Sequence, residues 1–368
     1  MQTADVIIIG GGIAGIGCAV MLSETANVIV LEQEASCGYH TTGRSAAMHV
    51  PSYGPPAMRR LTVASEAYLQ APPDALATES LLTSRGDMML ACPGEEAELE
   101  KLLSQSASQK EISVAEAVER VPILRAEKIS RVSFEAEASD IDVDRLLQSW
   151  IRLLRQRRGQ IETQAPVTSI KRDSTDWIVA AGTHDYRAPV VVNAAGAWGD
   201  QIAALAGLPA VGLSPCRRSA ALLPAPDHEG FLQWPMFAGI NEDWYSRPMS
   251  GRLMVSPADE DPVSAHDAAA DDMRLAEGLD CFEKMVTLPI ARVEHSWGGL
   301  RTFSADREPV VGFASNAPTF FWLVGQGGYG IQTAPALSRL AADLVLQNPL
   351  DDNFASLAAL LSPSRFGG

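Results

Sequence analysis

The sequence predicts an α/β fold, with a discontinuous Rossmann-like domain and a second domain built on a mainly antiparallel sheet. Three stretches support this expectation. A strand, a glycine-rich turn, a helix and another strand follow one another over residues 6–31. A similar strand, glycine loop and helix return over 320–346. Between them, residues 215–295 contain many prolines, aromatic residues and short strand-like runs, which is typical of an inserted antiparallel domain.

The first of these stretches has the order of a dinucleotide-binding unit. The apolar run Val6–Ile9 is typical of a buried parallel strand, and the glycines of 10–15 form the pattern G-x-G-x-x-G. An apolar helix over 16–22 and a strand over 28–31 follow, and the strand ends on Glu32. The glycines let a pyrophosphate approach the helix N-terminus, and Glu32 can accept hydrogen bonds from ribose hydroxyls. We therefore expect an ADP-containing dinucleotide here, rather than a glycine turn without a ligand.

The apolar stretch over 6–22 has a second interpretation, as a signal peptide or a membrane span. Neither fits, because the residues before it include no Lys or Arg and the glycines would break a continuous helix. The rest of the sequence has no other long apolar run. We expect a cytoplasmic protein with no integral membrane segment.

Composition excludes several classes of function. The chain has 368 residues, of which 46% are hydrophobic and 20% charged, so two connected globular domains are expected. Its formal charge of −16 argues against nucleic acid as a partner. The five cysteines are scattered and never in C-x-x-C spacing, which suits a reducing compartment. The six histidines show no paired spacing, so no metal site is expected.

The middle of the chain supplies elements between the two glycine-rich units. Patterns in this part predict surface helices over 94–120, an amphipathic helix over 144–158, and strands at 167–171, 177–181 and 189–192. The last of these strands leads into the small residues of 193–198. Small residues at this point again allow the backbone to approach a ligand closely.

Near the end of the sequence, the strand Phe320–Val324 leads into a glycine loop over 325–330 and a helix over 332–346. Either the positive end of this helix faces a ligand group, or the loop is a connector without a ligand. Two such units at opposite ends of the chain suit one long cofactor held at both ends. A flavin dinucleotide fits, with its pyrophosphate at the first helix and the edge of its ring at the last.

Five motifs together carry a family resemblance: Asp5–Gly15, Gly38–Ala47, Asn193–Trp198, Trp297–Arg301 and Gln326–Gln332. They resemble those of the FAD-dependent D-amino acid oxidase/dehydrogenase superfamily, which includes glycine and sarcosine oxidases. Within it, the bacterial D-arginine dehydrogenases are the most similar group, mainly through the second and fifth motifs. The resemblance implies hydride transfer from the substrate Cα to flavin N5, which gives an imino acid that hydrolyses to a 2-oxo acid and ammonia. It also implies a small-molecule substrate and an electron acceptor, which is oxygen, a quinone or another carrier.

The same resemblance implies two domains with the active site between them. The FAD-binding domain is expected over 1–80, 141–212 and 296–368, and the substrate-binding domain over 81–140 and 213–295. The expected cofactor contacts are Gly10, Gly12, Ile13, Ala14, Gly15, Glu32, Gln33, Thr42, Gly43, Arg44, Ser45, Ala46, Val167, Ala195, Gly196, Trp198, Arg301, Gly327, Gly328, Tyr329, Gly330, Ile331, Gln332 and Thr333.

FAD is expected to be noncovalent and dissociable. Some relatives attach it through a cysteine in the segment that corresponds to 302–305, where this chain has none. Others use a histidine near the position of His40, and the D-arginine enzymes share this histidine without a covalent link.

The resemblance places four side chains around the substrate carboxylate. Arg301 and Arg218 match carboxylate-binding arginines, and Arg217 is the neighbour that competes with Arg218 for this role. An arginine offers a planar fork that binds a carboxylate through two hydrogen bonds. Tyr53 and Tyr245 match hydroxyl groups around the substrate, although from sequence alone packing is the better interpretation of both rings.

Five further residues concern the amino group and the side chain of the substrate. Gly328 matches a backbone carbonyl that receives the amino group, and Gln332 begins the helix beneath the flavin. Asp87 falls where the D-arginine enzymes have a glutamate for the distal cation, although it also suits a solvated loop. Met48 and Val50 replace a histidine and a hydroxyl-bearing residue, so the pocket becomes more apolar. We expect long basic or apolar D-amino acids such as D-arginine, D-lysine or D-methionine.

Other functions stay open on the residues alone. The same fold oxidises other amines, such as glycine or sarcosine, and 2-hydroxy acids, which would need a general base. A protein that binds FAD without turnover is a third alternative.

Overall fold

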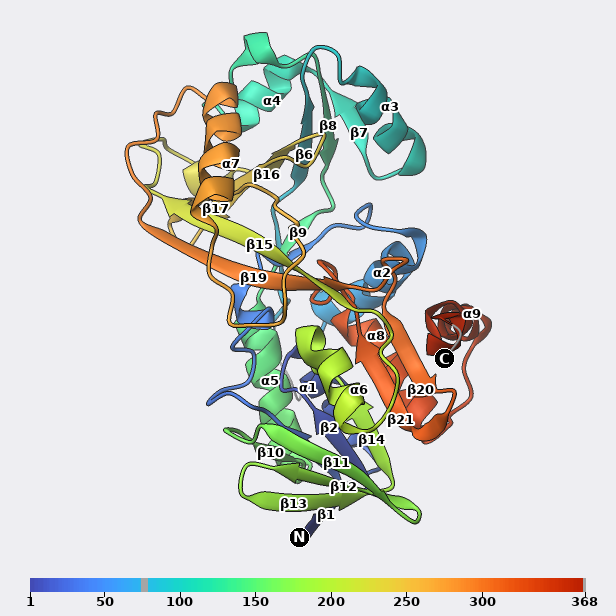
Figure 1. Ribbon diagram of the computed structural model, residues 1–368. Coiled ribbons are helices and arrows are strands. Elements are labelled where there is room, and N and C mark those ends of the chain that lie inside the picture. Colours follow the sequence, from blue (N-terminus) through green and yellow to red (C-terminus); the bar gives the residue numbers. More distant parts are fainter. Residues whose placement is uncertain (74–78, 367–368) are drawn as a thin grey trace.

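The computed structural model describes residues 1–73 and 79–366, so parts of two expected domain ranges, 74–78 and 367–368, lie outside the described residues (Figure 1). One sheet has six strands, and its adjacent pairs are parallel except for the last pair. In sheet order these strands are β10 (Gln160–Glu162), β3 (Val28–Leu31), β2 (Val6–Ile9), β14 (Val190–Asn193), β21 (Ala317–Val324) and β20 (Val310–Ala314). The runs of Val and Ile in its central strands are buried on both faces, as expected of a parallel sheet.

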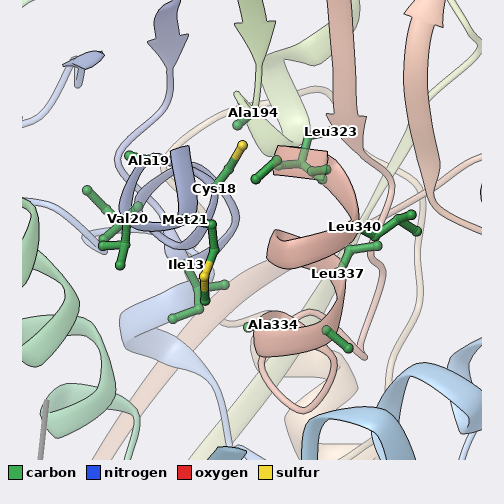
Figure 2. Close-up of a cluster of buried hydrophobic side chains, with 14 of the residues drawn as sticks. Ile13, Cys18, Ala19, Val20, Met21, Ala194, Leu323, Ala334, Leu337 and Leu340 are labelled. Carbon is green, nitrogen blue, oxygen red and sulfur yellow. The ribbon is translucent and has the colours of Figure 1, made fainter. Parts of the chain in front are cut away.

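Three helices pack against one face of this sheet: α1 (Ile13–Leu22), α5 (Val143–Gln156) and α8 (Ala334–Leu346). Figure 2 shows α1 beside α8, with Cys18 and Met21 of α1 and Leu337 of α8 in one apolar cluster. Gly17 allows this close packing. A Cβ atom at Gly17 would lie 2.2 Å from Ser338 Oγ and 2.7 Å from Trp150 Cζ3, so any side chain would push α1 away from both neighbours.

The opposite face of the six-stranded sheet is covered by a four-stranded sheet and by α6 (Gly199–Leu205). Trp177 and Tyr186 of the smaller sheet share a core with Ile7 and Trp322. Its strands, in order, are β1 (Gln2–Thr3), β13 (His184–Ala188), β12 (Asp176–Ala181) and β11 (Val167–Asp173).

A second large sheet has eight strands and lies at the upper end of the molecule in Figure 1. Its strands are antiparallel to their neighbours except for the pair β16 and β6. The order is β19 (His295–Phe303), β15 (Ser214–Leu223), β18 (Arg252–Ser256), β17 (Tyr245–Met249), β16 (Met236–Gly239), β6 (Asp87–Ala91), β8 (Arg131–Glu135) and β7 (Lys110–Ile112). Strand β19 belongs to this sheet, although most of its residues fall in the range expected for the cofactor domain.

The two faces of the eight-stranded sheet have different surroundings. One face buries Met88, Phe237 and Leu253 against Phe282 of α7 (Asp272–Met285) and Ala117 of α4 (Val114–Arg120). The other face carries a small apolar cluster formed by Ala220, Ala238, Tyr245 and Met254, with Met89 and Met236 packed against it. This second face lines the candidate site.

The remaining elements connect these layers. A three-stranded antiparallel sheet contains β4 (Met48–His49), β9 (Ser139–Ile141) and β5 (Leu82–Ser84). Helix α2 (Pro56–Gln70) contacts α8, and α9 (Asp352–Leu361) contacts β20. The 3-10 helices are η1 (Thr42–Arg44), η2 (Ala126–Lys128), η3 (Gly196–Trp198), η4 (Phe231–Gln233) and η5 (Pro363–Phe366).

The region expected to be only helical differs from the expectation. Residues 94–120 contain α3 (Glu96–Gln105) and α4, but the edge strand β7 separates them. Helix α4 begins with a capping box between Ser113 and Glu116, which fixes where the strand ends. Among the residues that the structure describes, no helix combines the length and the apolar composition needed to cross a lipid bilayer.

Candidate active site

An elongated cavity of about 410 Å³ is lined by the carboxyl ends of the parallel strands and by the second face of the eight-stranded sheet. Glu32 and Val167 line it in one region, and Arg218, Tyr245 and Arg301 line it in another. The expected cofactor contacts in its wall are Gly10, Gly12, Ile13, Ala14, Glu32, Gln33, Thr42, Arg44, Ser45, Ala46, Val167, Ala195, Gly196, Trp198, Arg301, Gly327, Gly328, Gly330 and Ile331. Gly15, Gly43, Tyr329, Gln332 and Thr333 lie behind this wall.

The first glycine loop brings three segments of backbone together. Gly10 has a φ of +111°, and a Cβ atom there would lie 2.4 Å from the carbonyl oxygen of Ala194. A Cβ atom at Gly15 would lie 1.9 Å from the carbonyl oxygen of Gly10, so Gly15 serves the close contact between α1 and the loop. Gly12 is the N-cap of α1 and offers no side-chain cap, which leaves N–H groups of the first turn directed at the cavity.

Glu32 lies at the end of β3 and is held by two backbone amides. Gly11 N donates to Oε2 at 2.7 Å, and Glu34 N donates to Oε1 at 2.8 Å. These bonds orient a nearly buried carboxylate while each oxygen keeps a second lone pair. The arrangement can therefore accept hydrogen bonds from vicinal hydroxyls of a ribose.

The segment after β3 covers the start of α1. The Thr42 hydroxyl accepts a hydrogen bond from Ile13 N at 3.0 Å. The Arg44 guanidinium is bound elsewhere, to Asp267 at 2.5 Å and to the carbonyl oxygen of Ala268 at 2.8 Å. Arg44 lines the cavity, but its charge is already balanced by Asp267.

The second glycine loop meets the eight-stranded sheet. Gly327 has a φ of +54°, and a Cβ atom there would lie 2.2 Å from the Phe303 ring. A Cβ atom at Gly328 would lie 2.8 Å from Arg301 Nη1, so the loop lies directly against this guanidinium and a larger residue would displace it. The side-chain amides of Gln326 and Gln332 each have a buried Nε2 with no hydrogen-bond partner in the described part of the chain.

Two guanidinium groups meet at the substrate end of the cavity. Arg301 of β19 and Arg218 of β15 line it, and neither forms an ion pair with any residue in 1–73 or 79–366. Burial, and then the charge of Arg301, lower the pKa of Arg218. Arg217 points the other way and pairs with Asp271 at 2.8 Å. The two uncompensated charges make this end of the cavity a site for an anion.

Two tyrosines adjoin these arginines. Tyr245 is buried; burial alone would raise its pKa, but the charges of Arg301 and Arg218 outweigh this and lower it. The Tyr53 hydroxyl lies 3.4 Å from Arg301 Nη1. Tyr53 comes from the segment that precedes α2, and its ring packs against Tyr329 with 5.0 Å between the centroids.

Asp87 lies farther along the same face of the eight-stranded sheet as Tyr245. Tyr245 pairs with Ala238, which pairs with Met89, and Asp87 is two residues from Met89 on the same strand. Met89 and Met236 are half-buried between these two positions. Asp87 is outside the cavity wall and buried, and its Oδ1 has no hydrogen-bond partner among the described residues.

The segment around β4 is tied to α2 and to the start of α8. Met48 is half-buried and pairs with Asp140 of β9. The His49 ring is buried away from the cavity, with Nε2 at 3.2 Å from the carbonyl oxygen of Thr62. Val50 N donates to Gln332 Oε1 at 3.1 Å, which ties this segment to the start of α8.

Comparisons with known proteins agree with this arrangement. The sequence profile of the family described as FAD dependent oxidoreductase (DAO) matches residues 5–344. The chain belongs to this family of FAD-dependent oxidoreductases. It is 26% identical to FAD-dependent oxidoreductase domain-containing protein 1 of Mus musculus, over 94% of this chain and 82% of the relative.

Solved structures show the same fold, as the sequence predicted. Glycine oxidase from Geobacillus kaustophilus matches with a TM-score of 0.87 and 21% identity, over 99% of both chains. L-alpha-glycerophosphate oxidase from Mycoplasma pneumoniae, described with FAD bound, matches with a TM-score of 0.85 and 20% identity, over 94% of this chain and 95% of that one.

The cavity of this FAD-dependent oxidoreductase fits the cofactor on its own chemistry. The first-turn N–H groups of α1 suit a pyrophosphate, and Glu32 suits the ribose hydroxyls. At the other end, Gln326 lines the cavity beside the second glycine loop, and its unpartnered Nε2 is a donor that would suit a carbonyl or nitrogen acceptor of a flavin ring.

Sequence reasoning missed several residues of the oxidoreductase site. Trp297 and Ala220 line the cavity from the eight-stranded sheet, and Gln201 lines it from α6. Trp297 is the first residue of the motif Trp297–Arg301, and its Nε1 donates to the carbonyl oxygen of Arg44 at 3.1 Å. Arg247, which forms an ion pair with Asp140, shares the face of Tyr245, and no sequence pattern marked it because strand register was unknown.

Proposed function

We propose that the protein oxidises D-amino acids with long basic or apolar side chains, using noncovalent FAD. The observation that carries this proposal is the pair Arg301 and Arg218, two charged groups at the end of the cofactor cavity without an anionic partner among the described residues. A substrate carboxylate supplies the missing negative charge. The D configuration rests on the resemblance of residues 38–47 and 326–332 to the D-arginine dehydrogenases.

The protein groups would act mainly by orienting the substrate. Arg301 and Arg218 hold the carboxylate, and the hydroxyls of Tyr53 and Tyr245 complete its hydrogen bonds. The family resemblance assigns the carbonyl oxygen of Gly328 as the acceptor for the substrate amino group. Its loop lies directly against Arg301, so the acceptor is close to the group that would hold the carboxylate. Bound FAD supplies the acceptor for the two electrons and the hydrogen from Cα. The imino acid product then hydrolyses to a 2-oxo acid and ammonia.

The sheet face beyond Tyr245 supports the preference for long side chains. Its methionines, Met89 and Met236, form an apolar surface on which an aliphatic chain can pack. Asp87 lies at the far end of this surface with an unpartnered oxygen, so it can receive a distal ammonium or guanidinium group. Apolar substrates use the methionine surface alone, which makes D-methionine and D-leucine competitors of D-lysine and D-arginine.

Noncovalent attachment of FAD is part of the proposal. His40 lines the cavity, but its Nε2 lies 2.9 Å from Glu34 Oε1 and its ring packs against Trp198 at 4.6 Å. Denaturation without proteolysis should release all of the flavin into the supernatant. Flavin that stays with the precipitated chain would contradict this part of the proposal.

Anaerobic reduction of the bound flavin tests the function as a whole. The panel contains D-lysine, D-methionine, L-lysine, sarcosine and 2-hydroxyhexanoate, and the loss of the visible absorbance of the oxidised flavin is followed for each. Bleaching by the two D-amino acids alone is expected. Faster bleaching by sarcosine or by the hydroxy acid would assign the protein to another donor class, and admission of air then shows whether oxygen reoxidises the flavin.

A further inference from the structure

We propose that Glu135 is a positioning residue that holds the segment 50–54 and so places the Tyr53 hydroxyl against Arg301. The inference rests on the proposed role of Tyr53 and Arg301 in binding a carboxylate. Glu135 lies on β8, outside the cavity wall, and belongs to none of the motifs that identify the family.

The carboxylate of Glu135 is fully buried and accepts four hydrogen bonds. Ser52 N and Ser108 Oγ donate to Oε1 at 3.1 and 2.6 Å. Gln109 Nε2 donates to Oε2 at 3.0 Å, and the Ser52 hydroxyl donates to the same oxygen. No cation pairs with Glu135 anywhere in the described ranges. Burying a carboxylate is expensive because it loses its hydration, and these four donors offset that cost.

Two of the four donors come from Ser52, the residue next to Tyr53. The same segment is held at its start by the bond from Val50 N to Gln332 Oε1, at 3.1 Å. At its end, Gly54 has a φ of +96° and lies against the Tyr329 ring, where a Cβ atom would be 2.7 Å from Cε1. Between these two points, Ser52 attaches the segment to β8 through its bonds to Glu135, and its hydroxyl also accepts a hydrogen bond from Gln109 Nε2 at 3.2 Å.

The contact that depends on this attachment is a long one. Tyr53 Oη lies 3.4 Å from Arg301 Nη1, at the outer limit of a hydrogen bond. A displacement of the segment by a few tenths of an ångström therefore breaks it. Glu135 and Arg301 belong to strands near opposite edges of the same sheet, so the sheet itself sets the distance that the segment must span.

Carboxylate binding measures the proposed effect directly. The FAD-loaded protein is titrated with benzoate, which has a carboxylate but no oxidisable amine, and the flavin absorbance reports the Kd. Glu135→Met keeps the bulk of the side chain but removes all acceptors, and it should raise the Kd about tenfold. Ser52→Ala keeps the backbone bond and should raise the Kd about threefold.

Two variants separate positioning from a general loss of stability. Glu135→Gln should bind benzoate almost as well as the parent protein. If the Gln109 amide rotates by half a turn, its Oε1, which has no hydrogen-bond partner in the described part of the parent chain, can accept from the NH₂ group that this substitution introduces. Ser108→Ala removes one bond to the same carboxylate but none to the segment 50–54, so its Kd should stay unchanged. With D-norleucine, whose side chain has no cation that could respond to a change at the neighbouring Asp87, Glu135→Met should raise KM more than it lowers kcat.

A double-mutant cycle with Tyr53→Phe gives the decisive result. If Glu135 acts through Tyr53, Glu135→Met or Ser52→Ala adds no further loss in the Tyr53→Phe background. Equal losses in both backgrounds, or an equal loss in Ser108→Ala, would overturn the positioning role. If Tyr53→Phe itself leaves the Kd unchanged, the proposed function of Tyr53 fails instead. If Glu135→Met does not fold, the cycle is measured with Ser52→Ala and Tyr53→Phe instead.

Discussion

Replacing Asp87 with asparagine should remove a pH-dependent preference for basic side chains. Burial, and then the nearby charge of Glu135, raise the pKa of Asp87 from 3.8 to about 7. Below this pH the carboxyl group is protonated and has no charge to attract a cation. As the pH rises through about 7 the group ionises, and a basic substrate side chain gains an attraction that an apolar one does not.

The size of the effect follows from the fraction of Asp87 that is ionised. If only the ionised form binds the distal cation, kcat/KM for D-lysine relative to D-norleucine should rise about tenfold between pH 6 and 8 and then level off. D-norleucine has the same aliphatic chain without the amino group, so ionisations shared by both substrates cancel in the ratio. The ratio is measured from initial rates with an artificial electron acceptor over this pH range.

The Asp87→Asn variant provides the control for this assay. Its ratio should be low and flat across the pH range, while its kcat/KM for D-norleucine stays near that of the parent protein. A ratio that is flat in the parent protein, or that keeps its slope in the variant, would refute the assignment of Asp87. D-glutamate as the best substrate would refute it as well, because its second carboxylate would meet Asp87.

Four other predictions concern stability, substrate binding and the cofactor. Because the folded state raises the pKa of Asp87, its contribution to stability is present below pH 3.8 and is lost as the pH rises through about 7. Asp87→Asn should therefore raise the free energy of unfolding at pH 8 by an amount on the order of 4 kcal/mol, at about 1.36 kcal/mol for each pKa unit, and should not raise it at pH 4; equal free energies of unfolding at pH 8 would contradict this. Arg301→Met should cost about 2–5 kcal/mol in kcat/KM, whereas Arg217→Met, which loses only the pairs with Asp259, Asp261 and Asp271, should leave kcat/KM within about twofold. Glu32→Ala should weaken FAD binding about tenfold or more in equilibrium dialysis, and saturating FAD should restore activity; unchanged affinity would show that Glu32 does not bind the ribose. Gly17→Val should lower the free energy of unfolding by about 1–3 kcal/mol in urea titrations, because the new side chain meets Ser338 and Trp150. An unchanged free energy of unfolding would show that α1 can shift away from these neighbours without cost.

The cofactor end of the site could be predicted from sequence because its parts are close together along the chain. The strand, the glycines and Glu32 lie within residues 6–32, and their spacing fixes their geometry. The structure adds the detail that Gly15 serves packing rather than the cavity wall. It also shows that the Arg44 charge is balanced by Asp267, a pairing across 223 residues that no local pattern indicates.

The substrate end is harder to predict because it is assembled across a sheet. Arg218 and Arg217 are adjacent in sequence, and only the register of β15 against β19 decides which one lines the cavity. The alternation of side chains along a strand puts neighbours on opposite faces, so a shift of one residue would exchange them. The helices expected in 94–120 are present, but the strand β7 between them was missed for a related reason, because β7 depends on pairing with β8 rather than on its own composition.

Register also explains how two carboxyl groups acquire different properties. Asp87 and Glu135 are direct partners in β6 and β8, both buried, and point from the same face of the sheet. Glu135 accepts four hydrogen bonds, an arrangement that suits an anion, while Asp87 Oδ1 accepts none. Two adjacent negative charges in a low-dielectric region repel each other, and burial with this repulsion raises the pKa of Asp87, the group with an unpartnered oxygen. A cationic side chain at the end of the methionine surface would stabilise the charged form of Asp87, as the neutral donors already do for Glu135, and binding of such a substrate should therefore release a proton near pH 7.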